Sequence, residues 1–460
     1  MAERPEIHPG KVAWSEPRPA YWPSARAAGT VERILYISHC PPYPPDKGER
    51  IRAFHEIKAL SREFRIDLAC LGRSGGELGK VGRLRPWCER IVTGRAGGWK
   101  GLLRGAVGVF CGRSVTECFF GGARFRRELA RLLAQGPYDI VMGYSSAVLA
   151  YVLAAPAAAH VVDLVDMDSL KWHSYAERAG RLFARLYRRE GRMVEQLERR
   201  AIRDCDAVVC ASVEEVRAAP VPSEKLHAVG NGVDADYFRP SCAADEVPPS
   251  LVFVGTMDYR PNVEAVCWFA GNVWPALKRR VPALRFSIVG RRPARQVRRL
   301  GRLPGLNVTG AVPDVRPYLL SARVAIAPLQ VARGVQNKVL EAMAMARPVV
   351  ASAAALAGLE ISGCPGVLRA GEPDEWLSVL SALLADGPRC ARLGRDARDL
   401  VLDRYTWAAR MGPLVLLCRR LVRRGEDSAK VAAGAAGGAA LRGSCEAPAA
   451  PAELHETQRR

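Results

Sequence analysis

Short apolar runs rich in Val, Ile and Leu alternate with helical stretches along most of the chain. A first series of runs lies at residues 33–38, 65–71, 138–144, 160–166 and 206–212. A second series lies at residues 250–257, 284–290, 306–312, 323–329 and 347–353. Strand-like runs that alternate with helices are typical of parallel sheets built from βαβ units. The pattern predicts an α/β protein in which this architecture occurs twice.

The segment RPSCAADEVPPS (239–250) separates the two series, and its prolines and small residues are typical of a linker. We therefore expect two doubly wound Rossmann-like domains, over residues 31–240 and 241–420, that face each other across a cleft. Ligands of such folds bind at the carboxyl ends of the strands, so the chemistry is expected in that cleft. Residues 1–30 and the low-complexity tail 425–460 are predicted to be disordered.

The composition fits a cytoplasmic globular protein. The chain has 460 residues, of which 49% are hydrophobic and 25% are charged. No apolar run reaches the roughly 20 residues of a membrane-spanning helix, and the N-terminus lacks the order of a secretory signal. The 13 cysteines are scattered without a Cys-x-x-Cys pair, so we expect reduced thiols and no metal site.

The net charge of +21 implies attraction to a polyanion, although a solvated basic face is the alternative. Arginines are concentrated at 180–203 and 290–303, without the aromatic side chains that single-stranded nucleic acids require, so nucleic acid is not an expected partner. The stretches 180–203 and 99–110 are amphipathic and could dock on an anionic membrane surface. Core packing of the same residues is the other interpretation.

The segment GVQNKVLEAMA (334–344) directly follows the loop after the run at 323–329. Gly334 lets the backbone approach a ligand, and the start of the following helix offers free N–H groups to a diphosphate. Glu341 lies two turns further along, on an otherwise apolar face. Its carboxylate could accept two hydrogen bonds from a ribose diol, or it could pair with Lys338 on the same face.

Several segments resemble the retaining GT-B glycosyltransferases of family four. They are NGVDADYFRP (231–240), VFVGTMDYRPN (252–262), VTGAVPDVRPYLLSARVAIAPL (308–329) and GVQNKVLEAMAMARPVVAS (334–352). More narrowly, residues 37–60 and 163–176 look like the sugar transferases of exosortase-associated (PEP-CTERM) exopolysaccharide loci. The resemblance covers most of residues 31–420 and implies a GT-B fold.

The resemblance implies roles for residues of the second domain. Glu341 matches the second acid of the family's Glu, seven residues, Glu motif, which holds the ribose. The first acid would fall on Arg333, which puts the usual sugar contact in doubt; Arg333 could meet a phosphate or an acidic sugar, or be a surface arginine. Arg260 and Lys338 are candidates for the basic pair that stabilises the diphosphate leaving group, and a solvent-facing Arg260 is the alternative.

Further candidates for donor binding are two glycines and two residues close to a glycine. Gly48 matches the first-domain glycine that faces the donor phosphates, although an ordinary helix start is the alternative. Gly255 lies in the GTMDYRPN segment after a strand, and Val335 follows Gly334 at the helix start. Asp46 serves equally well as a helix cap or as a functional residue.

Acidic residues follow the run at 160–166, where the family has a His-Asp pair facing the acceptor. Asp166 or Asp168, together with Lys171, would orient the acceptor hydroxyl here. Capping of a helix by Asp168 or Ser169 is the alternative.

We therefore expect a glycosyltransferase that moves a sugar from a UDP- or GDP-sugar donor to a polyprenyl-linked or oligosaccharide acceptor, with retention. The expected setting is bacterial exopolysaccharide or cell-envelope synthesis, in the cytoplasm or peripherally on the inner face of the plasma membrane. No cofactor or metal is expected, because cations of the chain and helix termini can serve the diphosphate. A nucleotide-sugar epimerase and a non-catalytic nucleotide-sugar binding module are the alternatives.

Overall fold

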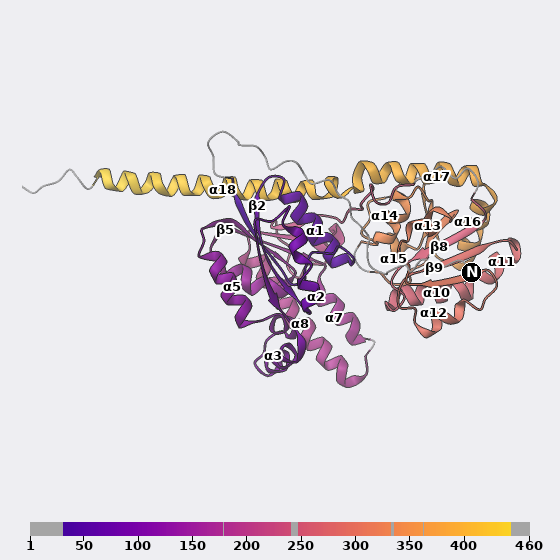
Figure 1. Ribbon diagram of the computed structural model, residues 1–460, viewed down its shortest axis with the longest axis horizontal. Coiled ribbons are helices and arrows are strands. Elements are labelled where there is room, and N and C mark those ends of the chain that lie inside the picture. The colour runs from indigo at the N-terminus through magenta and orange to yellow at the C-terminus, as the bar shows by residue number, and fades with distance from the viewer. Residues whose placement is uncertain (1–30, 178, 241–246, 333–334, 362, 443–460) are drawn as a thin grey trace, which may run out of the picture.

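The computed structural model describes residues 31–177, 179–240, 247–332, 335–361 and 363–442, and these form two α/β units, each around a parallel sheet. Figure 1 shows the two units next to each other, with the long last helix running along one side of the first unit. The predicted fold class, with two Rossmann-like units, is confirmed.

The first sheet has the strand order β3-β2-β1-β4-β5-β6-β7. Its strands are β1 (Arg33–Ser38), β2 (Arg65–Gly72), β3 (Arg90–Arg95), β4 (Tyr138–Tyr144), β5 (Ala157–Val165), β6 (Ala207–Cys210) and β7 (Leu226–Ala228). In the centre of the sheet, Ile34 lies opposite both Ile66 and Ile140. The central strands are mostly apolar, as is typical of strands in a sheet covered by helices on both faces.

Helices of the first unit pack on the two faces of this sheet. They are α1 (Gly48–Leu60), α2 (Gly75–Leu78), α3 (Gly98–Phe110), α4 (Val115–Phe119), α5 (Ala123–Leu133), α6 (Leu149–Ala154), α7 (Asp168–Glu177), α8 (Arg181–Asp204) and α9 (Val213–Arg217), with 3₁₀ turns η1 (Val81–Leu84) and η2 (Ser146–Val148). Alternate residues of β1 serve opposite cores: Ile34 and Tyr36 pack with α1, and Leu35 and Ile37 pack with α5 and α6.

The second sheet has the order β10-β9-β8-β11-β12-β13. Its strands are β8 (Ser250–Val254), β9 (Arg285–Val289), β10 (Leu306–Gly310), β11 (Val324–Ala327), β12 (Val349–Ala351) and β13 (Val367–Arg369). The helices are α10 (Arg260–Asn272), α11 (Trp274–Arg280), α12 (Arg295–Leu300), α13 (Arg316–Leu320), α14 (Asn337–Ala344), α15 (Ala353–Leu356), α16 (Pro373–Ala385) and α17 (Gly387–Leu400), followed by a π-helical turn η3 (Val401–Tyr405) and α18 (Trp407–Arg442). Both sheets reverse direction of strand addition in the middle, between β1 and β4 and between β8 and β11, where doubly wound folds bind ligands.

The chain returns to the first unit through α18. Trp407, Met411 and Leu414 are buried in the core that α1 forms with the first sheet. The range 241–420 expected for the second domain therefore ends with residues that pack on the first. The return runs beside the outgoing chain just before the predicted linker, because Val233 N–H donates to the Tyr405 carbonyl at 2.7 Å and Val233 forms a β-bridge with Thr406.

The disorder predicted from residue 425 onward is wrong as far as residue 442, because α18 continues to Arg442. This part of the sequence is rich in alanine, the residue with the highest helix propensity, and the helix extends from a well-packed first half. The predicted disorder of residues 1–30 and of the last 18 residues lies outside the described residues.

Candidate functional site

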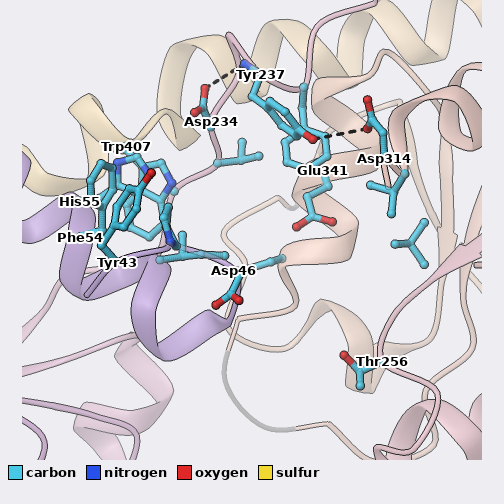
Figure 2. Close-up of a pocket in the computed structure, with 18 of the residues that line it drawn as sticks. Tyr43, Asp46, Phe54, His55, Asp234, Tyr237, Thr256, Asp314, Glu341 and Trp407 are labelled. Atoms are coloured by element: carbon cyan, nitrogen blue, oxygen red, sulfur yellow. Dashed lines mark hydrogen bonds between the residues drawn. The ribbon is translucent and has the colours of Figure 1, made fainter. Parts of the chain in front are cut away.

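A cleft of about 810 Å³ lies between the two units and is lined by residues of both. This volume lies within the range of about 300 to 1,000 Å³ that is usual for small-molecule sites. Figure 2 shows the aromatic side chains of Tyr43, Phe54, His55 and Trp407 on one side, with Glu341 and Asp314 on the other. The cleft meets the second sheet at the loops after β8, β9 and β10.

Two glycines bring the loops after β8 and β9 together. Gly290 has φ +155°, and a Cβ at this position would lie 1.7 Å from the Gly255 carbonyl oxygen. Only glycine fits at Gly290, because both the backbone conformation and the space exclude a side chain. Gly255 and Gly290 both line the cleft, which exposes backbone there to a ligand.

Glu341 on α14 points into the cleft (Figure 2). Its carboxylate makes no hydrogen bond or ion pair with any residue that the structure describes. Burial raises its pKa to about 7, and nearby Lys338 only partly offsets this effect. A partly buried carboxylate without a partner among the described residues is costly, which makes Glu341 a candidate ligand-binding residue.

Lys338 does not supply the missing partner. Its ammonium donates to Asn262 Oδ1 at 3.0 Å and to Gln336 Oε1 at 3.1 Å, and it lies 5.5 Å from the centre of the Phe253 ring. Burial lowers the pKa of Lys338 to about 8 despite the attraction of Glu341. Lys338 therefore lies behind the cleft wall and contributes a positive charge close to it.

Asn262 is a residue that the sequence analysis missed. Its side chain is buried and donates from Nδ2 to the Thr256 carbonyl at 3.0 Å while accepting from Lys338. It thereby fixes the turn after β8 to α14. The only sequence signal was its place one residue after Pro261 at the start of a helix.

A second polar group lies at the far end of the cleft, where β10 ends. The Arg316 guanidinium lies 4.0 Å from the centre of the Tyr237 ring and 2.7 Å from Asp314. Burial opposes ionisation of Asp314, but its hydrogen bonds from Arg316 hold its pKa below the usual range. Tyr237 is oriented by Asp234, which accepts its backbone N–H at 2.9 Å (Figure 2).

The first unit contributes an aromatic wall. His55 and Trp407 stack with ring centres 4.4 Å apart and planes 6° apart. Phe54 packs edge-on against Trp87 at 5.3 Å, and all four side chains line the cleft. Burial lowers the pKa of His55 to about 3, so this ring is neutral at pH 7.

A buried ionic group supports this wall from behind. Arg52 is 1% exposed and donates to Asp163 at 2.7 Å, to the Val229 carbonyl at 2.8 Å and to Asn231 at 2.9 Å. Glu56 lies 3.0 Å from Arg52. Asp163 is therefore a structural partner of Arg52, and the group holds the segment that leads to Gly232 in the cleft.

The acidic residues after β5 lie near the cleft but not among its lining residues. Burial, with the charges of Glu215 and Asp168, raises the pKa of Asp166 to about 6. Asp168 pairs with Lys171 at 3.8 Å. Burial alone would lower the pKa of Lys171, but the charge of Asp168, with smaller contributions from other groups, outweighs this effect and the pKa is raised.

Ser169 does not cap α7 with its own hydroxyl. The buried carboxylate of Glu198 accepts both the Ser169 N–H at 3.0 Å and its hydroxyl at 2.6 Å.

The remaining predicted residues are placed as follows. Arg260 starts α10, where its side chain is 63% exposed and pairs with Glu264 at 2.6 Å. Gly48 starts α1 with open space around it, and Val335 packs against the core of the second unit. None of these three lines the cleft. Arg333 and Gly334 lie outside the described residues.

Asp46 also lines the cleft and pairs with Arg50 at 3.3 Å. The structure thus brings Gly255, Glu341 and Asp46 into one cleft, with Lys338 just behind it.

Within the described ranges, no group of three or more His, Cys, Asp or Glu side chains is arranged to hold a metal ion. Over the same ranges, no helix combines the length and the apolar character that crossing a bilayer requires.

Two models of known families match the chain. One, described as glycosyl transferases group 1, matches residues 248–386, and the other, described as glycosyltransferase family 4, matches residues 104–237. Each model falls on one of the two units, and together they span more than half of the chain. No curated relative matches it.

Similar solved structures share the fold at low identity. Sucrose-phosphate synthase from Thermosynechococcus elongatus is 17% identical with a TM-score of 0.64, and the match covers 85% of this chain and 100% of that one. Anabaena HepE in complex with UDP is 14% identical with a TM-score of 0.57, covering 86% and 100%. WaaG, a glycosyltransferase of lipopolysaccharide biosynthesis, is 14% identical with a TM-score of 0.56, covering 82% and 97%. The chain is a glycosyltransferase of the GT-B fold, in which a family 4 domain precedes a group 1 glycosyl transferase domain.

Proposed function

We propose that this glycosyltransferase takes its sugar from a UDP- or GDP-sugar bound in the cleft, with the ribose on Glu341. The observation that carries the proposal is the Glu341 carboxylate, which faces the cleft and has no partner among the described residues. A ribose diol would supply the two hydrogen-bond donors that this carboxylate lacks. The Anabaena structure with UDP-glucose makes UDP-glucose the first donor to test.

The diphosphate would then lie over the turn after β8. Backbone at Gly255 is open to the cleft, and Lys338 adds a positive charge behind it through its contact with Asn262. Arg260 would have to leave Glu264 to reach a phosphate, and we retain it, with Gly48, Val335, Arg333 and Gly334, as an expected donor-binding residue. Charge that builds on the leaving diphosphate is stabilised by such preorganised cations without a metal.

The acceptor would approach along the first unit, near the first turn of α7. Asp166, with a pKa of about 6, can accept a proton from a hydroxyl group near neutral pH. Lys171 and Asp168 would orient that hydroxyl. We further propose transfer with retention to a polyprenyl-linked or oligosaccharide acceptor in exopolysaccharide or cell-envelope synthesis, on the inner face of the plasma membrane.

The test is calorimetric titration of UDP and GDP, each compared with its monophosphate. We expect one diphosphate to bind, and Glu341→Ala to weaken its binding by about 1 to 3 kcal/mol, the scale of losing hydrogen bonds to a charged group. Glu372→Ala is the matched control, because Glu372 is an exposed carboxylate of the same unit outside the cleft. If Glu341→Ala leaves the binding of the diphosphate unchanged, Glu341 does not hold the ribose.

A second assay separates transfer from the alternatives. Release of the free nucleoside diphosphate that depends on an added saccharide acceptor supports transfer. Conversion of the donor sugar without an acceptor would instead identify an epimerase.

A further inference from the structure

Helix α3 has a row of exposed apolar side chains along one face. Trp99, Leu103, Val107 and Phe110 follow one another at spacings of four, four and three residues, which places them on the same side of a helix. Trp99 is 71% exposed and Phe110 is 91% exposed. A continuous exposed apolar row of this kind marks an interaction surface.

The α7–α8 hairpin extends this surface. Tyr175 at the end of α7 and Phe183 and Leu186 at the start of α8 are also exposed. The two parts are linked, because Arg189 of α8 donates to the Val109 carbonyl at the end of α3 at 2.8 Å. Figure 1 shows α3 and the α7–α8 hairpin together on the side of the first unit opposite α18.

The link between α8 and the α3–α4 region is rigid. Glu190 of α8 is buried and accepts hydrogen bonds from the Ser114 hydroxyl at 2.7 Å and from the N–H groups of Val115 and Thr116 at 2.9 Å. A ligand that contacts one helix therefore meets the other in a fixed position.

Four exposed arginines lie along one side of α8, while Glu177 at the end of α7 is an exposed acidic residue of the same hairpin. Arg181, Arg185, Arg188 and Arg192 are exposed and follow the helical spacing of four, three and four residues along α8. None of these arginines pairs with a carboxylate of the described residues. Residues 96–116 contain no Asp or Glu, so no acidic side chain of that segment competes with a bound anion for the arginines.

We propose that the exposed apolar row of α3, made of Trp99, Leu103, Val107 and Phe110, together with the four exposed arginines along one side of α8, docks on an anionic lipid bilayer. Apolar and aromatic side chains enter the boundary between headgroups and acyl chains, while arginines bind the lipid phosphates. A second copy of the chain fits less well, because a two-fold contact would place the same basic helix against itself. The proposal rests on this surface alone and is independent of the donor site.

Flotation of the full chain with vesicles tests the proposal. Vesicles of phosphatidylcholine alone are compared with vesicles of phosphatidylcholine and phosphatidylglycerol in equal parts. We expect binding to the anionic vesicles to be tighter by about tenfold or more, because each arginine near the surface contributes about fivefold. Trp99→Ser with Phe110→Ser should lower that binding by about tenfold, and Arg185→Glu with Arg188→Glu, which removes two such contributions, should lower it by about 25-fold or more.

Matched variants test whether position matters. Arg298→Glu with Arg302→Glu makes the same charge change on an exposed part of the second unit, and Leu416→Ser removes an exposed leucine of α18. Both should bind vesicles as the unchanged chain does. Calorimetric nucleotide binding in solution, measured on every variant, shows that the fold is intact and keeps the two proposals separate.

Three outcomes would overturn the proposal. The first is equal or absent binding to both kinds of vesicle, and the second is an equal loss in the Arg298/Arg302 variant. The third concerns the variant Trp99→Ser with Phe110→Ser. If light scattering shows that this variant has a different oligomeric state while its vesicle binding is unchanged, the apolar row is a protein interface.

Discussion

The Lys338 ammonium donates a hydrogen bond to the amide oxygen of Asn262 across 3.0 Å, which ties α14 to the turn after β8. Glu341 lies less than one helical turn from Lys338 in the sequence, yet no ion pair within 4.0 Å forms between these two described residues. The amide of Asn262 thus keeps the ammonium away from the carboxylate. As a consequence, Glu341 keeps its hydrogen-bonding capacity for a ligand.

Asn262→Ala should weaken binding of the nucleoside diphosphate by about fivefold, because Lys338 loses a partner and the turn after β8 loses a hydrogen bond of about 1 kcal/mol. The nucleoside monophosphate, which extends less far toward the turn, should be affected less than twofold by rough estimate. Calorimetry with both ligands measures the difference. Asn272→Ala, at the exposed end of α10, is the control, and equal losses for both ligands would contradict a role for Asn262 in positioning Lys338.

Glu341→Gln should stabilise the ligand-free protein at pH 8 by about 1 to 3 kcal/mol. Because the folded pKa of about 7 lies above the ordinary value of 4.5, the contribution of the Glu341 carboxyl group to stability is fully present below pH 4.5 and is lost as the pH rises through 7. The advantage of the variant should therefore shrink between pH 8 and pH 5. Urea titrations at both pH values measure it, with Glu372→Gln as the exposed control, and a variant less stable than the unchanged chain at pH 8 would refute the argument.

Arg52→Ala should destabilise the protein by about 3 to 5 kcal/mol, because Asp163 and Glu56 would remain buried without their cation. Arg52→Lys should recover only part of this loss, since lysine cannot bond to Asp163 and Asn231 in the same planar arrangement. Arg62→Ala, an exposed arginine just after α1, should change stability by less than about 0.5 kcal/mol. Urea unfolding of the three variants measures these changes in stability. A loss for Arg52→Ala as small as that for Arg62→Ala would contradict the prediction.

His55→Phe should reduce the loss of stability on going from pH 7 to pH 5 by about 1 to 2 kcal/mol. The folded pKa of about 3 lies below the ordinary 6.5, so this contribution is present above 6.5 and falls as the pH drops toward 3. Phenylalanine keeps a ring against Trp407 but takes up no proton. The comparison uses thermal unfolding at both pH values, and a pH dependence of His55→Phe equal to that of the unchanged chain would contradict it.

Local sequence predicted the central strands closely but missed β3, β7 and β13. The run at 138–144 coincides with β4, because its residues are apolar and buried on both sides. In contrast, β3 carries arginine at both ends, and β7 and β13 have three residues each. These three strands are held by pairing at or near the sheet edges, which no local pattern encodes.

The candidate site was predictable only where a residue conflicts with its surroundings. Glu341 stood out as an acid on an apolar helix face. Arg52 did not, because its partner Asp163 is 111 residues away in the sequence. Arg260 pairs with Glu264 and lies outside the cleft. The sequence could not show this, since the residues around Arg260 fit a phosphate-binding loop as well as the surface of a helix.

The outgoing chain at Val233 is bonded to the returning chain at Tyr405 and Thr406, so both crossings between the units pass through one point, which can serve as a pivot. We expect closing of the cleft around a substrate to be a rotation about this pivot. Gly232 sits at the pivot, where a Cβ would lie 2.7 Å from the Trp407 backbone nitrogen. A side chain at Gly232 would push the outgoing and returning chains apart, and would thereby change the distance between the two walls of the cleft.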